Sequence, residues 1–329
     1  MARQGTAICV AHSWAAAAYL RELTEGWLKQ PPRFEWRLIL SDHARQVFGN
    51  SPAASRFGNS ESDLVSDVRN ACDEPGPKAV FVSAGGAKVE LDVVASTRST
   101  GVPVLQYIDT WYGYRRRMQK GAGLVLGDRI LVIDQCAINE AVAEGLPPDI
   151  LVAVGHPVWE RCHSLPPIQI RRLLFIGAPV QRDYGTNLGY TEVDAWQMLK
   201  ETLDASPHLA DDIIYAPHPD DASPLVIDGI EVVKYQSELL SSVDTVIGMF
   251  SAPLIEAFLV GRRVITLQPH ASGYDMCPLS RHNRIPRVTT CGALTAALTA
   301  MPPDPGQLSV SLTGSCARVT SEIERALAA

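Results

Sequence analysis

The chain has 329 residues, of which 46% are hydrophobic and 20% are charged. This balance is typical of a folded globular protein and excludes a disordered chain. The length is about twice that of a usual single domain, which predicts two domains. A formal net charge of −7 argues against non-specific binding of nucleic acid or of anionic membranes.

Seven cysteines are spread along the chain without a CxxC pair. This pattern predicts reduced thiols in a cytoplasmic protein, and neither a disulfide framework nor a zinc site. The apolar start of the chain is too short for a secretory signal, and no apolar run reaches the roughly 18 residues that a membrane span needs. The richness in alanine and arginine is typical of a GC-rich bacterial source.

Short β-branched runs alternate with amphipathic stretches in the first half of the chain, as in βαβ units around a parallel sheet. Strands are expected at 6–11, 36–40, 79–83, 102–108, 129–133 and 150–154. Helices are expected at 14–28, 89–99 and 136–144. The segment 50–61 is rich in Ser, Asn and Gly, and we expect it to be a mobile surface loop.

Proline and glycine become frequent at 155–170, where the apolar periodicity breaks, so we expect a hinge there between domains 1–155 and 156–329. The alternation then restarts, with strands expected at 172–176, 212–216, 231–233, 245–248 and 263–267. Helices are expected at 192–203, 252–260 and 316–328. The predicted architecture is α/β, with two Rossmann-like domains whose parallel sheets face a central cleft.

Polar residues that directly follow a predicted strand are the first candidates for a site, because ligands of open parallel sheets bind at the carboxyl ends of the strands. His218 and Pro219 follow the strand expected at 212–216, and a second proline precedes the histidine. The prolines fix the histidine and prevent it from joining a strand ladder, since proline lacks the N–H donor. We interpret His218 as a ligand contact; a rigid turn with an exposed histidine is the alternative.

The segment after the strand expected at 245–248 predicts the start of a helix that binds phosphate. The strand ends at Gly248, Ser251 occupies an N-cap position and Pro253 lies in the first turn. Free N–H groups and the helix dipole attract anions at such a start. Glu256 lies more than one turn further on, where it could reach a ribose; a solvated Glu256 on a plain capped helix is the alternative.

The order of these motifs resembles that of nucleotide-sugar enzymes with the two-domain GT-B fold, which include glycosyltransferases and non-hydrolysing sugar epimerases. The segments that carry the resemblance are the glycine turn at 154–159, the strand and glycine turn at 173–179, the His218-Pro219 pair and the strand–helix–strand at 244–267. The His-Pro pair resembles that of sialyltransferase and capsule-type transferase families, which favours a CMP- or other pyrimidine-nucleotide donor. The last motif departs from the epimerase pattern, since 249–257 has a single glutamate and no Gly-Gly pair.

This resemblance implies that the second domain binds the nucleotide-sugar donor. It places Gly177 at the first glycine turn of that domain and Arg182 where it could neutralise a pyrophosphate. It also turns the loop after the strand at 263–267 towards the donor, so His270 or Ser272 would touch it. The acidic pair at 220–221 has no partner ligands at a useful spacing. No metal and no cofactor are therefore expected beyond the nucleotide-sugar co-substrate.

The first domain would then hold the acceptor, whose hydroxyl must lose a proton to a base. Asp109 is our first candidate for this base, because it ends a predicted strand beside Trp111, Tyr112 and Tyr114, which can stack on a sugar. Capping of the next helix is the alternative role of this aspartate. His12, directly after the first strand, is the alternative base, unless it is only a strand-end histidine bonded to the backbone.

The predicted activity is the metal-independent transfer of a sugar from a nucleotide sugar to an acceptor that the sequence does not identify. The alternatives are a sugar-nucleotide epimerase or hydrolase, and a non-catalytic protein that binds nucleotide sugars. The fold by itself does not separate these alternatives. The sequence leaves the oligomeric state open.

Overall fold

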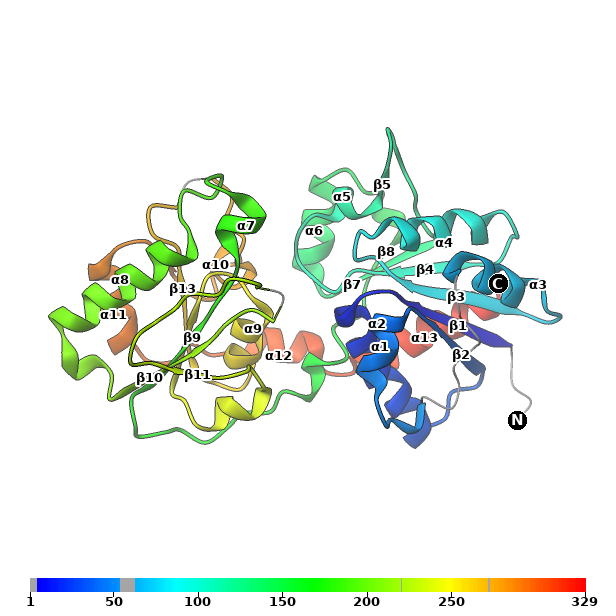
Figure 1. Cartoon of the computed structure of the whole chain (residues 1–329). Helices are drawn as coiled ribbons and strands as arrows, with labels where there is room; N and C mark the ends of the chain where they lie inside the picture. The colour runs from blue at the N-terminus through cyan, green and yellow to red at the C-terminus, as the bar shows by residue number, and fades with distance from the viewer. Residues whose placement is uncertain (1–4, 54–62, 220, 272) are drawn as a thin grey trace. The chain divides into compact units, whose positions relative to one another are not determined.

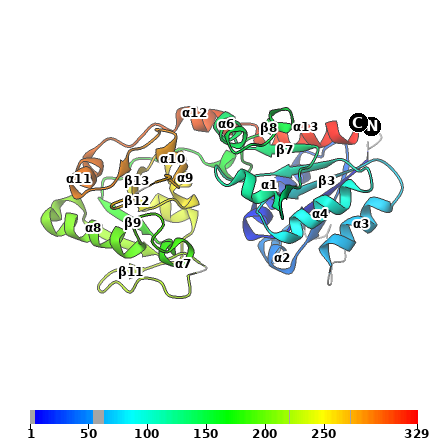
Figure 2. The same ribbon diagram turned by 90° about the horizontal axis from the view of Figure 1, so that it is seen from above.

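The computed structural model describes residues 5–53, 63–219, 221–271 and 273–329. These residues form two units: unit 1 comprises Met1–Arg161 and Val310–Ala329, and unit 2 comprises Cys162–Ser309. In each unit, helices cover a central sheet (Figures 1 and 2). From residue 54 on, the expected surface loop at 50–61 lies outside the described residues.

In its described residues, unit 1 is built on a six-stranded sheet with the order β2-β1-β3-β4-β7-β8, in which all neighbours are parallel. The strands are β1 (Thr6–Ala11), β2 (Glu35–Leu40), β3 (Lys78–Ser83), β4 (Val104–Tyr107), β7 (Arg129–Val132) and β8 (Leu151–Ala153). A short antiparallel pair, β5 (Gln119–Lys120) and β6 (Gly123–Leu124), stands apart from this sheet. The central strands are buried on both faces, which explains their nearly continuous apolar sequences.

Helices pack on both faces of this sheet. One face is covered by α1 (Trp14–Lys29), α2 (Asp42–Phe48) and α13 (Ser315–Leu327), and the other by α3 (Leu64–Asp73) and α4 (Lys88–Arg98). Two further helices, α5 (Tyr114–Met118) and α6 (Gln135–Ala143), follow β4 and β7. The start of α1 is fixed by Ser13, whose hydroxyl accepts a hydrogen bond from the N–H of Ala16 at 3.2 Å.

Unit 2 repeats this architecture, with the described strand order β11-β10-β9-β12-β13-β14 and parallel pairing throughout. Its strands are β9 (Arg172–Ile176), β10 (Asp212–Ala216), β11 (Glu231–Val232), β12 (Thr245–Gly248), β13 (Arg263–Leu267) and β14 (Arg287–Val288). Its helices are α7 (Val180–Tyr184), α8 (Glu192–Ala205), α9 (Ala252–Leu259), α10 (Pro278–Arg281) and α11 (Cys291–Thr299). The next helix, α12 (Gly306–Leu312), begins in unit 2 and ends in unit 1, which resumes at Val310. Figures 1 and 2 show α8 and α11 on one face and α9 on the other.

The expected α/β class with two parallel sheets is confirmed. The C-terminal helix, however, differs from the expected division of the chain, because α13 packs on β1, β3 and β4 of unit 1. Its apolar residues recur every four positions, at Val319, Ile323 and Leu327, and this stripe is buried in the core of unit 1. Trp27 of α1 also donates a hydrogen bond to Thr320 at 2.8 Å.

The segment expected to contain the hinge begins inside unit 1. Gly155 has a φ of +84°, and a Cβ atom there would lie 2.0 Å from the hydroxyl oxygen of Ser315, so only glycine fits. The Glu160 carboxylate accepts hydrogen bonds from the N–H groups of Gly314 and Cys316 at 2.6 and 2.9 Å. These contacts bind the chain to α13 before it enters unit 2 at Cys162.

No helix in the described part of the chain is long and apolar enough to cross a membrane.

Candidate functional site

The carboxyl edge of the unit 2 sheet brings together four segments that the sequence singled out. His218 and Pro219 follow β10, Gly177 follows β9, Ser251 follows β12, and His270 follows β13. The strand order β10-β9-β12-β13 places these segments side by side, because all four strands are parallel. This edge is the candidate nucleotide site.

At two of these strand ends, a side chain larger than that of glycine would meet close neighbours. At Gly177, a Cβ atom would lie 2.8 Å from the hydroxyl oxygen of Tyr215, and at Gly248 it would lie 3.3 Å from the Ile176 side chain. The two glycines therefore leave room for the side chains of Tyr215 and Ile176 at the edge where a ligand would bind. Their part in ligand binding stays a prediction.

Ser251 is the N-cap residue of α9, as expected, with an extended backbone (φ −76°, ψ 157°). Its hydroxyl nevertheless caps nothing, because the residue two positions on is Pro253, which has no N–H to offer. The N–H of Leu254 bonds to the Ser251 carbonyl at 3.1 Å. Among the described residues, the buried Ser251 hydroxyl therefore has no hydrogen-bond partner.

His218 is half-buried between Pro217 and the exposed Pro219. It acts electrostatically on Asp183 of α7, whose pKa is lowered first by a hydrogen bond from Arg182 and also by the nearby His218. The guanidinium of Arg182 and the carboxylate of Asp183 form an ion pair at 2.6 Å. A pyrophosphate would thus compete with Asp183 for the charge of Arg182.

Glu256 is held by two hydroxyl groups from the segment after β11. Its Oε2 accepts hydrogen bonds from Tyr235 at 2.7 Å and from Ser237 at 2.9 Å. Burial raises the pKa of Tyr235, and the Glu256 carboxylate adds to this rise, so the tyrosine stays a donor. Glu256 is therefore not the solvated side chain of a plain helix, and a ribose would have to share this carboxylate.

The loop after β13 is shaped by Asp275. This carboxylate accepts hydrogen bonds from the Gln268 side chain at 2.8 Å, the N–H of Cys277 at 2.9 Å and the Ser280 hydroxyl at 2.6 Å. His270 is exposed and has a φ of +52°, an uncommon left-handed conformation for a residue other than glycine. Ser272 lies outside the described residues.

In unit 1, Asp109 and His12 lie at the carboxyl edge of the sheet, after β4 and β1. Asp109 is half-buried, and burial raises the pKa of its carboxyl while the Arg117 guanidinium opposes the rise. The N-cap of α5 is Gly113, so the alternative role of Asp109 as the cap of that helix does not apply. The His12 carbonyl accepts a hydrogen bond from Ser41 at 2.7 Å, and its imidazole acts electrostatically on Glu90.

Two of the three aromatic residues expected to stack on a sugar are fully buried, so that expectation is wrong for them. Trp111 donates a hydrogen bond to Asp134 at 2.9 Å and stacks on Trp159 at 5.4 Å, and Tyr114 bonds to Glu140 on α6. Tyr112 lies under the Arg117 guanidinium, 5.0 Å away. Trp111 and Tyr114 therefore belong to the core, whereas Tyr112 is half-buried.

Trp14 is an exposed aromatic residue at this edge that the sequence reading did not select. It is the first residue of α1, directly after the cap Ser13, and 56% of its surface is exposed. Its position, three residues after the end of a buried strand, was the signal in the sequence that could have selected it. A large aromatic side chain that remains exposed at the ligand-binding edge of a sheet is suited to stack on a sugar or a base.

Glu90 is a buried acid that the sequence reading also missed. It lies in the first turn of α4, accepts hydrogen bonds from the Ser83 hydroxyl and from the N–H of Ala87, and is 1% exposed. Burial raises the pKa of Glu90. A Cβ atom at Gly85 would lie 3.2 Å from its Oε2, so Glu90 packs closely against the turn after β3 at the same edge.

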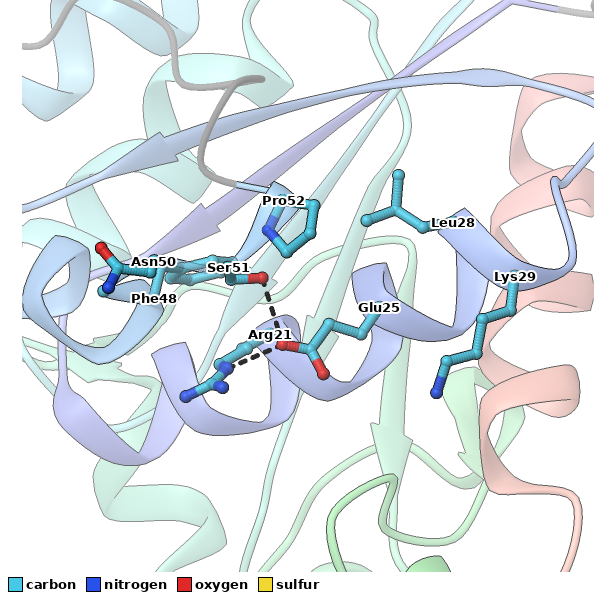
Figure 3. A pocket seen from close by; sticks show the side chains of 9 residues that line it. Arg21, Glu25, Leu28, Lys29, Phe48, Asn50, Ser51 and Pro52 are labelled. Carbon is cyan, nitrogen blue, oxygen red and sulfur yellow. Dashed lines mark hydrogen bonds and ion pairs between the residues drawn. The ribbon is translucent and has the colours of Figure 1, made fainter.

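A separate pocket of about 620 Å³ lies beside the second half of α1 (Figure 3). It is lined by Arg21, Glu25, Leu28, Lys29 and residues 48–52. Figure 3 shows the Glu25 carboxylate bonded to Arg21 and Ser51. None of the predicted site residues lines this pocket, and we assign it no role.

Among the described residues, no cluster of three or more His, Cys, Asp or Glu side chains could hold a metal ion.

No family model matches this sequence, and no curated protein matches it. Solved structures of similar fold include the UDP-GlcNAc 2-epimerase of Neisseria meningitidis bound to UDP-GlcNAc, with 12% identity, a TM-score of 0.63 and coverage of 97% of this chain and 100% of that one. They also include MnaA of S. aureus with UDP, with 11% identity, a TM-score of 0.65 and coverage of 98% and 97%. A putative UDP-N-acetylglucosamine 2-epimerase from Listeria monocytogenes shares 14% identity with a TM-score of 0.63 over 98% and 96%.

The likeness spans nearly the whole of each chain at very low identity. It therefore establishes the fold, a two-domain α/β architecture like that of UDP-GlcNAc 2-epimerases and of the GT-B type.

Proposed function

We propose that this chain is an enzyme that acts on a nucleotide sugar, with the nucleotide held by unit 2. The observation that carries the proposal is the carboxyl edge of the unit 2 sheet. There, the start of α9 and the buried hydroxyl of Ser251, which has no partner among the described residues, lie beside the segments that carry Gly177 and His218. Solved proteins of the same fold bind UDP or UDP-GlcNAc, according to their descriptions.

The start of α9 is suited to bind phosphate. The N–H of Ala252 and the positive end of the helix dipole favour an anion. Pro253 removes one of the usual N–H donors, and the Ser251 hydroxyl supplies a donor in its place. His218 would add a further donor next to β9, and Glu256 would accept hydrogen bonds from the ribose hydroxyls.

In the proposed reaction, unit 1 supplies Asp109 as a base at the sugar or at its acceptor. A carboxylate in a partly buried position is a stronger base than one in water, because burial favours its protonated form. Negative charge that develops on the nucleotide phosphate as its bond to the sugar breaks would be stabilised by the start of α9 and by His218. Trp14 would hold the sugar by stacking.

Two reactions are in competition for this site. Similarity to solved UDP-GlcNAc 2-epimerases favours epimerisation of the sugar. The sequence at 249–257 favours glycosyl transfer, because it has a single glutamate and lacks the Gly-Gly pair of the epimerase motif. We therefore propose epimerisation as the first reaction to test, and glycosyl transfer from a UDP- or CMP-activated donor as the second.

Calorimetry with UDP, CMP, CDP, GDP and ADP tests the nucleotide site, with Ser251→Ala as the variant. The matched control is Ser242→Ala, at an exposed serine that precedes the amino end of β12, whereas Ser251 follows its carboxyl end. We expect one pyrimidine nucleotide to bind and Ser251→Ala to weaken it. Absence of binding by all five nucleotides would refute the proposal.

Incubation of the chain with UDP-GlcNAc and with CMP-activated sugars, followed by proton and phosphorus NMR, then separates the reactions. A new sugar epimer with the nucleotide still attached indicates an epimerase. Slow release of free nucleotide without an epimer indicates a transferase that hydrolyses its donor when the acceptor is missing. Tight binding with an unchanged ligand would leave a binding protein.

A further inference from the structure

The hydroxyl group of Tyr19 is an anomaly in the core of unit 1. Tyr19 lies on the buried face of α1 and is 1% exposed, yet its hydroxyl has no hydrogen-bond partner among the described residues. A buried polar group without a partner costs free energy, and phenylalanine would fill the same space without that cost. We therefore looked for a neighbouring group that could accept a hydrogen bond from the Tyr19 hydroxyl.

The ring of Tyr19 is directed across the sheet towards the end of β4. It packs against Phe81 of β3 with ring centroids 6.0 Å apart, and against Tyr107, the last residue of β4, at 4.5 Å. Asp109 follows two residues later. The Asp109 carboxylate raises the pKa of Tyr19 more than any other charged neighbour does, although burial is the larger cause.

The other polar neighbours of Tyr19 are already engaged. The hydroxyl of Tyr107 donates to the Gly155 carbonyl at 2.9 Å. The two oxygens of Glu90 accept from Ser83 and from the N–H of Ala87. Cys9 is a weak acceptor and is fully buried. Among the described residues, the hydrogen bond that lowers the pKa of Asp109 comes from its own backbone, which leaves its carboxylate with spare acceptor capacity.

We propose that Tyr19 is a positioning residue for Asp109: its hydroxyl donates a hydrogen bond to the Asp109 carboxylate, directly or through one buried water, and keeps this base ionised and oriented. A carboxylate that accepts such a bond is stabilised in its charged form. The other ionisable groups around the pair are Arg117 on α5, Glu90 on α4, His12 after β1, and Tyr107 with Cys316 of α13 behind it. The inference rests on the proposed role of Asp109 as the base.

The titration of Asp109 in the whole protein tests this contact without any ligand. Carbon-13 NMR of protein labelled at its aspartate carboxyl groups follows the titration, and Asp109→Asn assigns the signal. In Tyr19→Phe we expect the pKa of Asp109 to rise by about one pH unit, a tenfold change in its acid dissociation constant. An unchanged titration in this variant would overturn the proposal.

Tyr190→Phe is the matched control, because Tyr190 in unit 2 is 2% exposed and its hydroxyl also lacks a partner among the described residues. We expect no change of the Asp109 titration in that variant. If Tyr19→Phe folds poorly, urea unfolding of the single variants at Tyr19 and Asp109 and of the double variant gives their coupling. A coupling of zero would overturn the proposal.

The outcome is separable from that of the proposed function. A shifted Asp109 titration in a protein that binds no nucleotide would establish the contact between Tyr19 and Asp109 and refute the proposed function. Nucleotide-sugar turnover with an unshifted Asp109 titration would support the proposed function and refute the contact between Tyr19 and Asp109. If both the activity and the contact are found, we expect the acidic limb of the plot of turnover against pH to move to higher pH in Tyr19→Phe, with KM unchanged.

Discussion

The buried imidazole of His156 gives unit 1 a stability that depends on pH. His156 is 7% exposed and stacks on Trp159 at 3.8 Å, with Tyr107 at 6.2 Å on another side. Burial lowers the pKa of His156 from 6.5 to about 3. The folded state therefore holds this imidazole neutral at a pH where the unfolded chain protonates it.

The sign and size of the effect follow from proton linkage. Between the two pKa values the unfolded state binds more protons, so stability falls as the pH is lowered from about 6.5 towards 3. From pH 7 to pH 5, protonation of His156 in the unfolded chain lowers the free energy of unfolding by about 2 kcal/mol, because each pH unit below the unfolded pKa costs about 1.4 kcal/mol. Above pH 7 this group contributes no further change.

The comparison uses His156→Phe, which retains an aromatic ring for the stack but cannot be protonated. Urea unfolding at pH 7 and pH 5 is followed by tryptophan fluorescence, which reports mainly on unit 1, since five of the six tryptophans lie there and only Trp196 lies in unit 2. We expect the free energy of unfolding to fall by about 2 kcal/mol more in the native protein than in the variant between pH 7 and pH 5.

A second variant controls for the general effect of losing a histidine. His208 is exposed in unit 2, and His208→Gln should keep the pH dependence of the native protein. An equal loss of stability in the native protein and in His156→Phe would refute the argument that burial keeps the His156 imidazole neutral.

Three further predictions address the site. His218→Ala and Ser251→Ala should each weaken nucleotide binding by about 1–3 kcal/mol, because in the proposed site each would remove a hydrogen bond to a charged phosphate. Unchanged calorimetric affinity in both variants would remove the assignment of the nucleotide site to unit 2. Asp109→Asn should lower turnover by about 10²–10⁴-fold with nearly unchanged nucleotide affinity, so full turnover would pass the role of base to His12. Trp14→Ala should raise the KM of the sugar or acceptor by roughly 2- to 10-fold and leave the thermal unfolding midpoint unchanged, whereas a large fall of that midpoint would identify a packing role.

The sequence by itself determined the class of the fold and the edge of each sheet that carries the candidate site. Strands buried on both faces need continuous apolar runs, and runs such as 6–11 and 79–83 are therefore visible without a structure. The rule that ligands bind at the carboxyl ends of parallel strands then selected Asp109, His218 and Ser251 from local position alone.

Local signals also located the N-cap at Ser251 but not the state of its side chain. The sequence shows that Pro253 lacks an N–H group. Only the structure shows that the Ser251 hydroxyl is buried and has no hydrogen-bond partner among the described residues. Short-range rules describe what a residue can do, whereas the surrounding fold decides whether its partners are present.

Only the tertiary structure decided which aromatic residues face outward and to which unit the last helix belongs. The sequence around Asp109 gave no sign that Trp111 would be covered by Trp159, which comes from a segment nearly fifty residues away along the chain. The apolar stripe on α13 predicts an amphipathic helix, but such a stripe could pack on the sheet of either unit. Its packing on unit 1 involves contacts such as the hydrogen bond from Trp27 to Thr320. Pairings of this kind join residues far apart in the sequence, so no local pattern encodes them.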